Sequence, residues 1–352
     1  MATPKELLET CVREGASDLH VTVGRAPVLR KHGRLVDVPG CAVLEAADTE
    51  AFVKAIAPER SWKEALEVGS ADFAILHSAE ARFRVNIYKQ KGFYGAACRL
   101  IPTRLLSFDE LGLPDNVKDL VTRPRGLLLV TGPTGSGKTT TLAAMVNYLN
   151  QNYDRHIVTI EDPVEYYHSH NKSVIMQREL GVDVPSFSEG MRRALRQDPN
   201  VILLGEMRDL ETISAAITAA ETGHLVLATL HTTGAARTVD RIIDAFPTEA
   251  QEQIRAQLSV SLIAVISQSL LSRCDKPGRV AAFEIMVMTP AVENHIRKNE
   301  TFKIPSAIQT SRRLGMILLD DHLLELWKAG KIDRDTALRT AQQPKDLEPK
   351  LV

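Results

Sequence analysis

Features typical of secreted, zinc-binding or disulfide-linked proteins are scarce in this chain of 352 residues. Its four cysteines lie far apart and form no C-x-x-C pair, so the sequence indicates neither a zinc module nor a disulfide framework. The N-terminus mixes charged residues with an amphipathic period and lacks the apolar core of a signal peptide. We therefore expect a cytoplasmic protein with reduced thiols at Cys11, Cys41, Cys98 and Cys274.

The sequence also lacks a basic excess and a long apolar run. Lys plus Arg number 43 and Asp plus Glu number 44, so the formal net charge is -1 and no stable nucleic-acid partner is indicated. The longest uncharged stretch, residues 257–272, contains several serines and is shorter than the ~18 to 20 apolar residues that span a bilayer. Any membrane contact is therefore expected to be peripheral.

Changes in composition divide the chain into four parts. Residues 1–102 are predicted to form an α+β domain, in which ARFRVNIY places Phe83 and Val85 on one face of a strand. Residues 103–120 have mixed polarity and are interpreted as a linker. Residues 121–290 carry the long apolar runs, and residues 291–352 are expected to be helical with a frayed tail.

Four apolar runs in the third part predict buried strands, with helix-like segments between them. This alternation is typical of a parallel α/β sheet with helices on both faces. The runs are residues 126–132, 155–162, 201–206 and 224–231. After them, apolar side chains recur every four residues over 248–271 and predict one helix that packs on the sheet. That apolar set is Ile254, Leu258, Leu262, Ile266 and Leu270.

The most specific signal is GPTGSGKTT, which fits the pattern G-x-x-x-x-G-K-[ST] between a predicted strand and a predicted helix. Its glycines let backbone N–H groups converge on phosphate oxygens, and Lys138 neutralises the β and γ charge. Thr139 offers its hydroxyl to Mg²⁺. The segment therefore predicts binding of ATP with Mg²⁺. The predicted nucleotide-binding residues are Gly132, Thr134, Gly135, Ser136, Gly137, Lys138, Thr139 and Thr140.

Another apolar run ends in Gly205 and Glu206, where a nucleotide hydrolase usually has an Asp-Glu pair. We expect this strand to lie beside the strand that precedes the phosphate loop, and Glu206 to orient or deprotonate the attacking water. Because Gly205 has no carboxylate, Glu161 and Asp162 are predicted to hold the hydrated metal with Thr139. Glu206 and Glu161 are thus the predicted catalytic acids. Any one acid could instead cap a helix or pair with a cation.

Two histidines flank the fourth apolar run. A lone histidine is more often a packing or surface residue. Parallel strands, however, place His231 at the same sheet edge as Lys138 and Glu206, within reach of a γ-phosphate. We therefore predict that His231, together with His224 just before the strand, senses the phosphate.

Four segments together resemble the Walker A, Asp box, Walker B and His box of the type II/IV secretion traffic ATPases, whose Walker B is normally Gly-Glu. The segments are GPTGSGKTT, VTIEDPVEY, DPNVILLGEMRD and ETGHLVLATLHTT. The stretches ASDLH, RFRVN, VAAFEIM and AIQTSRRLGM are similar to the branch that drives type IV pilus retraction and twitching motility. The extension and secretion branches usually carry a long N-terminal extension and a four-cysteine zinc module, which are not found here.

This resemblance implies a PAS-like N-terminal α+β domain, then a RecA-like P-loop ATPase domain with C-terminal helices. It also implies a homohexamer that binds ATP at the junction between subunits and acts on a pilus platform protein at the inner membrane. In such a ring Arg82, Arg84 and Arg99 are candidate arginine fingers. Solvated strand arginines would give the same pattern.

Three other interpretations remain open. The chain could be a pilus-extension or type II secretion ATPase, a nucleotide-gated scaffold that does not hydrolyse ATP, or a translocase on nucleic acid, which the balanced charge does not favour. The retraction branch carries a segment resembling AIRNLIRE, and residues 291–298 here are AVENHIRK. The differences at Glu293, His295 and Lys298 change charge on a short predicted helix, so a docking surface could be altered while hydrolysis is retained.

Overall fold

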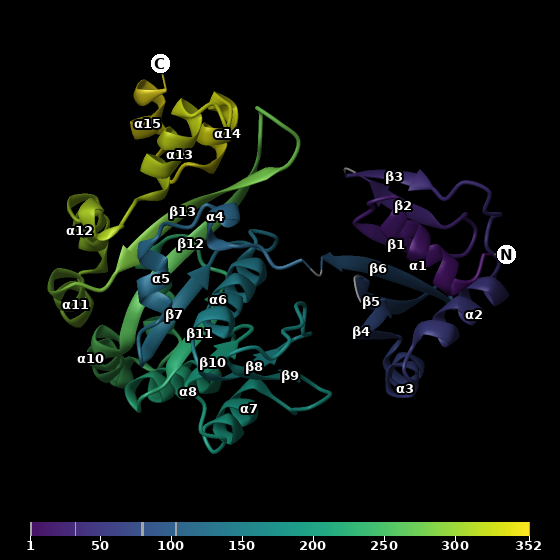
Figure 1. Cartoon of the computed structure of the whole chain (residues 1–352), viewed down its shortest axis with the longest axis horizontal. Helices are drawn as coiled ribbons and strands as arrows, with labels where there is room; N and C mark the ends of the chain where they lie inside the picture. Colours follow the sequence, from purple (N-terminus) through teal and green to yellow (C-terminus); the bar gives the residue numbers. More distant parts are fainter. Residues whose placement is uncertain (1, 32, 79–80, 103, 352) are drawn as a thin grey trace. The chain divides into compact units, whose positions relative to one another are not determined.

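The computed structural model describes residues 2–31, 33–78, 81–102 and 104–351. The chain forms two compact units, and Figure 1 shows the elements of each. Unit 1 comprises Met1–Arg104 and the short segment Pro163–Tyr167, and unit 2 comprises Leu105–Asp162 and His168–Val352. Each unit has a hydrophobic core of its own, so each is described by itself.

Unit 1 is built on a six-stranded antiparallel sheet in the order β3-β2-β1-β6-β5-β4. The predicted strand ARFRVNIY is part of β5, and Phe83, Val85 and Ile87 are fully buried as their alternation predicts. The helices are α1 (Pro4–Arg13), α2 (Ala46–Ile56) and α3 (Glu59–Val68). The strands are β1 (Asp18–Val21), β2 (Val28–Lys31), β3 (Arg34–Asp37), β4 (Ser70–Ser78), β5 (Ala81–Gln90) and β6 (Phe93–Pro102).

Unit 2 is built on a seven-stranded sheet in the order β13-β12-β7-β11-β10-β8-β9. All neighbours are parallel except β12 and β13, which form an antiparallel hairpin. The four predicted strands are β7 (Gly126–Thr131), β8 (His156–Glu161), β10 (Val201–Leu204) and β11 (Leu225–Leu230). The others are β9 (Val174–Glu179), β12 (Leu262–Ser272) and β13 (Arg279–Val287).

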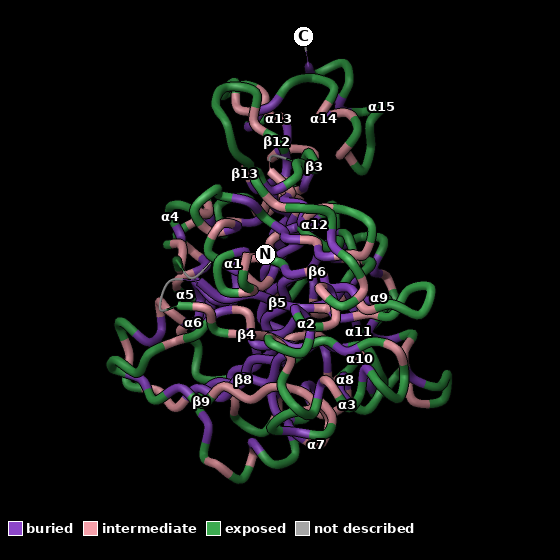
Figure 2. The backbone as a smooth tube through the Cα atoms, turned by 90° about the vertical axis from the view of Figure 1, so that its right-hand side faces the viewer, coloured by how far each residue is buried: buried purple, intermediate pink, exposed green. Residues whose placement is uncertain are grey.

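The central strands of this sheet are covered on both faces. Every residue of β7 and of β11 is buried, and Figure 2 draws buried residues of the chain in purple. A strand with successive side chains on opposite faces can be buried throughout only if helices cover both faces. The mixed α/β fold with a parallel sheet is thus confirmed. Helices α4 to α10 are Phe108–Leu111, Asn116–Val121, Lys138–Asn152, Phe187–Ala194, Leu210–Glu221, Ala235–Asp244 and Gln251–Ser261.

One predicted neighbour relation is wrong. We expected β10, which leads to Glu206, to lie beside β7, but β11 lies between them. Strands β7, β10 and β11 are all short, apolar and buried, so the sequence pattern contains no information on their order in the sheet. On its other side β10 lies beside β8, since Leu204 pairs with Ile160.

The predicted helix over 248–271 is also wrong in its second half. Helix α10 ends at Ser261, and strand β12 begins at Leu262 and pairs with β7. A spacing of four residues fits one face of a helix, but it is an even number and therefore also fits one face of a strand. The β-branched residues Ile263, Val265 and Ile266 favour the strand, and β12 is buried through most of its length.

The segment predicted as a linker is partly helical. Helices α4 and α5 lie within it, and Phe108, Val117 and Leu120 are buried in the core of unit 2. Gly112 caps the C-terminal end of α4 with its backbone in the left-handed conformation, and it separates α4 from α5.

Helices α13 to α15 form a small C-terminal body at the end of the β12–β13 hairpin (Figure 1), whereas α11 and α12 pack on the main core of unit 2. Helices α13 to α15 share a hydrophobic cluster with Leu271 and Ala282 of the hairpin, separate from the main core. The expected frayed tail is wrong, because Leu347 and Leu351 are buried in this cluster. Helices α11 to α15 are Pro290–Arg297, Ile304–Thr310, Leu319–Lys328, Arg334–Thr340 and Pro344–Leu347.

Candidate functional site

The phosphate-binding segment lies between β7, which ends at Thr131, and α6, which begins at Lys138. Lys138 is buried, and its ammonium donates hydrogen bonds to the carbonyls of Gly132 and Pro133, at 2.8 and 3.0 Å. Thr134 and Gly135 are exposed at the tip of the loop. The loop therefore curls around the lysine side chain and holds its charge at the start of α6, where the helix dipole also favours an anion.

Gln268 of β12, which no sequence motif marks, holds the other side of this loop. Its amide donates to the carbonyl of Ser136 at 2.6 Å, and its side-chain oxygen accepts from the Thr141 hydroxyl at 2.7 Å. A Cβ at Gly132 would lie 2.2 Å from the Gln268 carbonyl oxygen, and one at Gly137 would lie 2.8 Å from its amide nitrogen. Strand β12 thus leaves no room for a side chain at Gly132 or Gly137, and this is part of the reason why both positions are glycine. A buried glutamine within an apolar strand was the available signal.

The loop also contains a donor that suits a phosphate oxygen. The hydroxyl of Ser136 is buried and has no hydrogen-bond partner among the described residues. An unsatisfied buried hydroxyl is costly unless a ligand completes its hydrogen bonds. Thr139 follows in the first turn of α6 and is only partly buried. These residues fit a phosphate group held by the loop and a metal held by the Thr139 hydroxyl.

Glu206 lies just after β10 and is held from two sides. His231 Nε2 lies 2.9 Å from Oε1 of Glu206, and the Arg208 guanidinium lies 2.7 Å from Oε2. Burial acts to raise the pKa of Glu206, but the hydrogen bonds and charges of Arg208 and His231 outweigh it, so the pKa is below its usual value. The same hydrogen bond raises the pKa of Arg208. Glu206 is therefore an ionised, oriented acceptor at neutral pH.

Glu161 is the last residue of the neighbouring strand β8, and Asp162 follows it. Glu161 is buried and accepts a hydrogen bond from the Thr159 hydroxyl at 2.7 Å, whereas Asp162 is exposed. Gly205, at the end of β10, explains why no acid precedes Glu206. A Cβ at Gly205 would lie 3.3 Å from the Glu161 Cα and 3.4 Å from the Ile160 carbonyl oxygen. The close approach of the two strand ends therefore leaves little room for a side chain at position 205.

The two histidines lie at opposite ends of β11. His231 follows the strand at the edge where β7 leads into the phosphate loop, and Leu230 pairs with Thr131. His224 precedes the strand, where its Nδ1 lies 3.1 Å from the Ala219 carbonyl oxygen. The structure thus brings His231 and Glu206 together, at the sheet edge that also bears Lys138. It does not bring His224 to that edge, because the whole of β11 separates the two histidines.

The three arginines predicted as fingers lie in unit 1. Arg99 pairs with Asp18 at 2.9 Å, and Arg84 lies 3.9 Å from Asp72. Arg82 is buried, and its guanidinium lies 3.9 Å from the centre of the Tyr167 ring. Tyr167 belongs to the segment Pro163–Tyr167, which is part of unit 1. Each of the three therefore has a local partner in its own unit.

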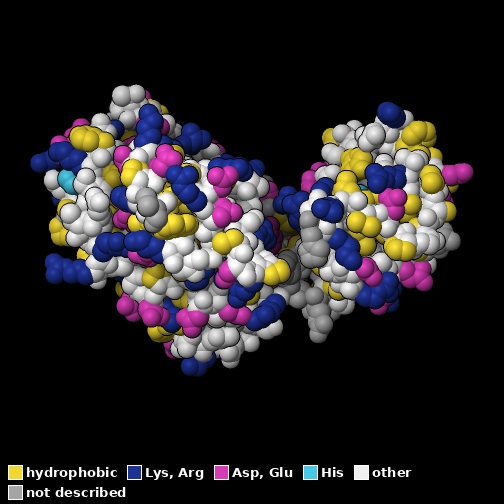
Figure 3. Space-filling view, turned by 90° about the horizontal axis from the view of Figure 1, so that it is seen from above, with side chains coloured by type: hydrophobic (Ala, Val, Ile, Leu, Met, Phe, Trp, Pro, Cys, Tyr) yellow, Lys and Arg dark blue, Asp and Glu magenta, His cyan; other side chains and the backbone are white. Residues whose placement is uncertain are grey.

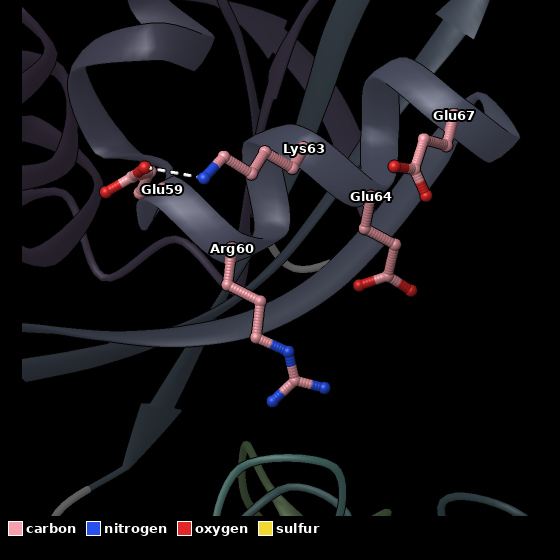
Figure 4. A pocket seen from close by; sticks show the side chains of 5 residues that line it. All are labelled: Glu59, Arg60, Lys63, Glu64 and Glu67. Carbon is pink, nitrogen blue, oxygen red and sulfur yellow. Dashed lines mark hydrogen bonds and ion pairs between the residues drawn. The ribbon is translucent and has the colours of Figure 1, made fainter.

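A hollow on α3 is open and carries charge of both signs. Figure 4 shows its lining side chains pointing outward from one helix, with Lys63 paired to Glu59 at 2.7 Å. Figure 3 shows acidic and basic side chains interspersed on the face that it draws.

Among the described residues, no group of three or more His, Cys, Asp or Glu could hold a metal ion. A metal at the phosphate loop would thus need ligands from phosphate and water, as Mg²⁺ prefers.

No helix within the described ranges is long and apolar enough to cross a membrane.

The chain is 48% identical over 344 residues to the type IV pilus retractation ATPase PilT of Pseudomonas aeruginosa, covering 97% of this chain and 99% of that protein. It is 47% identical over 323 residues to a twitching motility protein of Neisseria gonorrhoeae, covering 91% and 86% of the two chains. The predicted resemblance to pilus retraction ATPases is confirmed.

A crystal structure of the pilus retraction motor PilT with bound ADP superposes on this chain with a TM-score of 0.93, at 40% identity, over 99% of this chain and all of that one. A family model described as Type II/IV secretion system protein matches residues 4–286. This match covers the sheet of unit 1, the phosphate loop, Glu206 and His231. The chain is therefore a member of the Type II/IV secretion system protein family.

Proposed function

We propose that this chain is the ATP-hydrolysing motor of type IV pilus retraction. The observation that carries the proposal is the contact between Glu206 and His231 at the sheet edge that bears Lys138, in a chain similar to PilT over nearly its whole length. A nucleotide-gated scaffold would not need an ionised acceptor fixed by two hydrogen bonds beside a phosphate loop. The arrangement instead suits attack of water on a γ-phosphate.

Each residue of the edge has a separate task in this proposal. Backbone N–H groups of the phosphate loop and the Lys138 ammonium bind the phosphates, and the Ser136 hydroxyl completes its hydrogen bonds on them. Glu206 orients the attacking water. The hydrogen bonds from Arg208 and His231 hold the carboxylate in place for this task. His231 fixes the Glu206 carboxylate and senses the γ-phosphate.

Mg²⁺ is the metal that fits this donor set. Bound by the Thr139 hydroxyl, by Glu161 and Asp162 through water and by the phosphates, it would neutralise the negative charge that resists attack on phosphorus. Glu161 is pre-oriented for this role by the hydrogen bond from Thr159. Asp162, being exposed, is placed to accept hydrogen bonds from metal-bound water.

The motor works as a homohexamer with ATP bound where neighbouring subunits meet. Arg82, Arg84 and Arg99 of unit 1 are the candidate arginine fingers, which would act on the nucleotide of another subunit. Arg99 is the most exposed of the three at its side chain, with 71% accessible. Its release from Asp18 would therefore cost less than release of a buried arginine.

The hexamer acts on the platform protein at the membrane-embedded base of the pilus, from the cytoplasmic side of the inner membrane. Retraction is favoured over extension because the chain matches PilT over nearly the full length of both proteins. The altered segment AVENHIRK makes up most of α11 and its C-cap, where Glu293 on the helix is partly exposed and the cap residue Lys298 is exposed. Differences there change a docking surface and leave the distant phosphate loop intact.

Steady-state ATP hydrolysis, measured with solution mass, tests the proposal. Glu206→Gln removes the ionised acceptor, and we expect phosphate release to fall at least ~100-fold while the hexamer persists. The matched control is Glu211→Gln, because Glu211 is an exposed acid on α8 close by in sequence. Equal hydrolysis by Glu206→Gln and wild type would remove Glu206 from the mechanism. A deletion strain that loses pili, instead of keeping persistent pili, would indicate extension.

A further inference from the structure

Glu284 of β13 is a buried carboxylate that lies outside the phosphate site. It accepts a hydrogen bond from the backbone N–H of Ala235 at 2.7 Å and one from the Gln342 amide at 2.9 Å. Its second oxygen also lies 3.5 Å from the N–H of Leu319. Burial raises the pKa of Glu284, and these three donors act against that shift. The carboxylate therefore joins three segments that are far apart in the sequence.

One of these segments is the loop that carries His231. The loop runs from the end of β11 at Leu230 to the start of α9 at Ala235. Its last residue before α9, Gly234, donates its N–H to the Ser267 hydroxyl at 2.8 Å, and a Cβ there would lie 3.1 Å from the Gln342 amide nitrogen. The end of the loop is thus fixed by Ser267, Glu284 and Gln342. This end, at Ala235, lies four residues after His231 in the chain.

The other two segments belong to the C-terminal helices. Gln342 follows α14, and its own N–H and that of Gln343 donate to the two carboxylate oxygens of Asp320 on α13, at 2.7 and 2.8 Å. Asp320 thus fixes the segment that positions the Gln342 side chain. These helices pack with the hairpin in a hydrophobic cluster separate from the main core, so any displacement of the helices would act on Gln342.

We propose that Gln342 and Glu284 are positioning residues that couple the placement of the C-terminal helices to the His231 loop. The inference rests on the proposed function, since His231 in turn holds Glu206. A partner that moves the C-terminal helices would draw the Gln342 amide away from Glu284 and Gly234. The Ala235 N–H would then be held less firmly, and the His231 loop would lose its fixed end.

An exchange of the two side chains tests this coupling. Gln342→Glu places a second carboxylate against Glu284, so we expect kcat to fall about tenfold. The KM for ATP should stay within about twofold, since Gln268 still holds the phosphate loop. In the double variant Glu284→Gln with Gln342→Glu, an amide again faces a carboxylate. Its Gln oxygen can still accept from Ala235, so kcat should recover to within about threefold of wild type.

The matched control is Gln343→Glu, which makes the same change one position further along; both residues are exposed, but it is the Gln342 side chain that donates to Glu284, so kcat of the control should equal that of wild type. Hydrogen exchange of peptides covering residues 231–238 gives a readout that does not depend on hydrolysis. Exchange should be faster in Gln342→Glu, return to the wild-type rate in the double variant, and be unchanged in Gln343→Glu.

Two results would overturn the coupling. In one, Gln342→Glu and Gln343→Glu behave alike in kcat and in exchange. In the other, the double variant fails to restore either quantity, although its thermal unfolding matches that of wild type. If the wild-type protein hydrolyses no ATP, the proposed function fails, and the exchange rates of residues 231–238 still decide whether the link exists.

Discussion

His231 Nε2 lies 2.9 Å from Oε1 of Glu206, and this contact joins the ends of two adjacent strands, β11 and β10. The other carboxylate oxygen faces Arg208, so both oxygens of Glu206 have a partner. A carboxylate fixed in this way keeps one orientation at no further entropic cost when substrate arrives. The contact between His231 and Glu206 is thus the feature whose removal should affect the chemical step more than binding.

We expect His231→Ala to lower kcat about tenfold to a hundredfold, because a hydrogen bond to a charged group is lost at the step that uses it. The affinity for ADP should remain within about threefold, since Lys138 and the phosphate loop are unchanged. The control is His224→Ala, at the opposite end of β11, for which kcat should stay within about twofold. Equal loss in both variants, measured as phosphate release at saturating ATP, would contradict a separate role for His231.

A second prediction concerns Gln268. Gln268→Ala removes two hydrogen bonds from the phosphate loop, at Ser136 and Thr141, and leaves a space beside Gly137. We expect the Kd for ADP to rise about tenfold, because the loop must be ordered again on binding. Titration calorimetry with ADP measures this. Ser269→Ala, at the adjacent and less buried position of β12, is the control and should bind ADP as wild type does.

A third prediction concerns the missing acid of the Walker B strand. Gly205→Asp restores the usual Asp-Glu pair, but its Cβ would press on the backbone at Ile160 and Glu161. We expect lower thermal stability and lower kcat than wild type, because the two strand ends must separate by a few tenths of an ångström. Gly205→Ala adds the same Cβ without charge, so it should reproduce the loss of stability. A gain in kcat for Gly205→Asp would instead show that an acid is tolerated there.

Local patterns predicted much of this molecule. The phosphate loop and the strand ends bearing Glu161, Glu206 and His231 follow from short motifs, because parallel strands bring their carboxyl ends to one edge. The order of β7, β10 and β11 did not follow, since buried strands look alike in sequence. Gln268 and Glu284 were missed for a related reason: their partners are more than thirty residues away, so no local spacing marks them.

The last prediction concerns Asp18 and its partner Arg99. Asp18 is buried, and it faces Arg99 at 2.9 Å and Arg30 at 3.5 Å. Burial acts to raise the pKa of Asp18, but the hydrogen bonds from Arg99 and from Ser17 outweigh it and lower the pKa. A carboxyl group whose pKa is lower in the folded state stabilises that state above its unfolded pKa of about 3.9. This stabilisation disappears as the pH falls through the lower, folded value.

Asp18→Asn should therefore lower the thermal midpoint at pH 7, and the difference from wild type should shrink as the pH falls below about 4. The control is Asp37→Asn, because Asp37 pairs with Arg25 at an exposed site, where an ion pair contributes little.

The variant Asp18→Asn also tests Arg99 as an arginine finger, since it frees the Arg99 guanidinium from its ion pair without removing the arginine. If Arg99 must leave Asp18 to reach a nucleotide, kcat should rise or stay equal in Asp18→Asn while stability falls. A fall in kcat together with an unchanged midpoint would mean that the ion pair itself, and not the freed arginine, serves the motor.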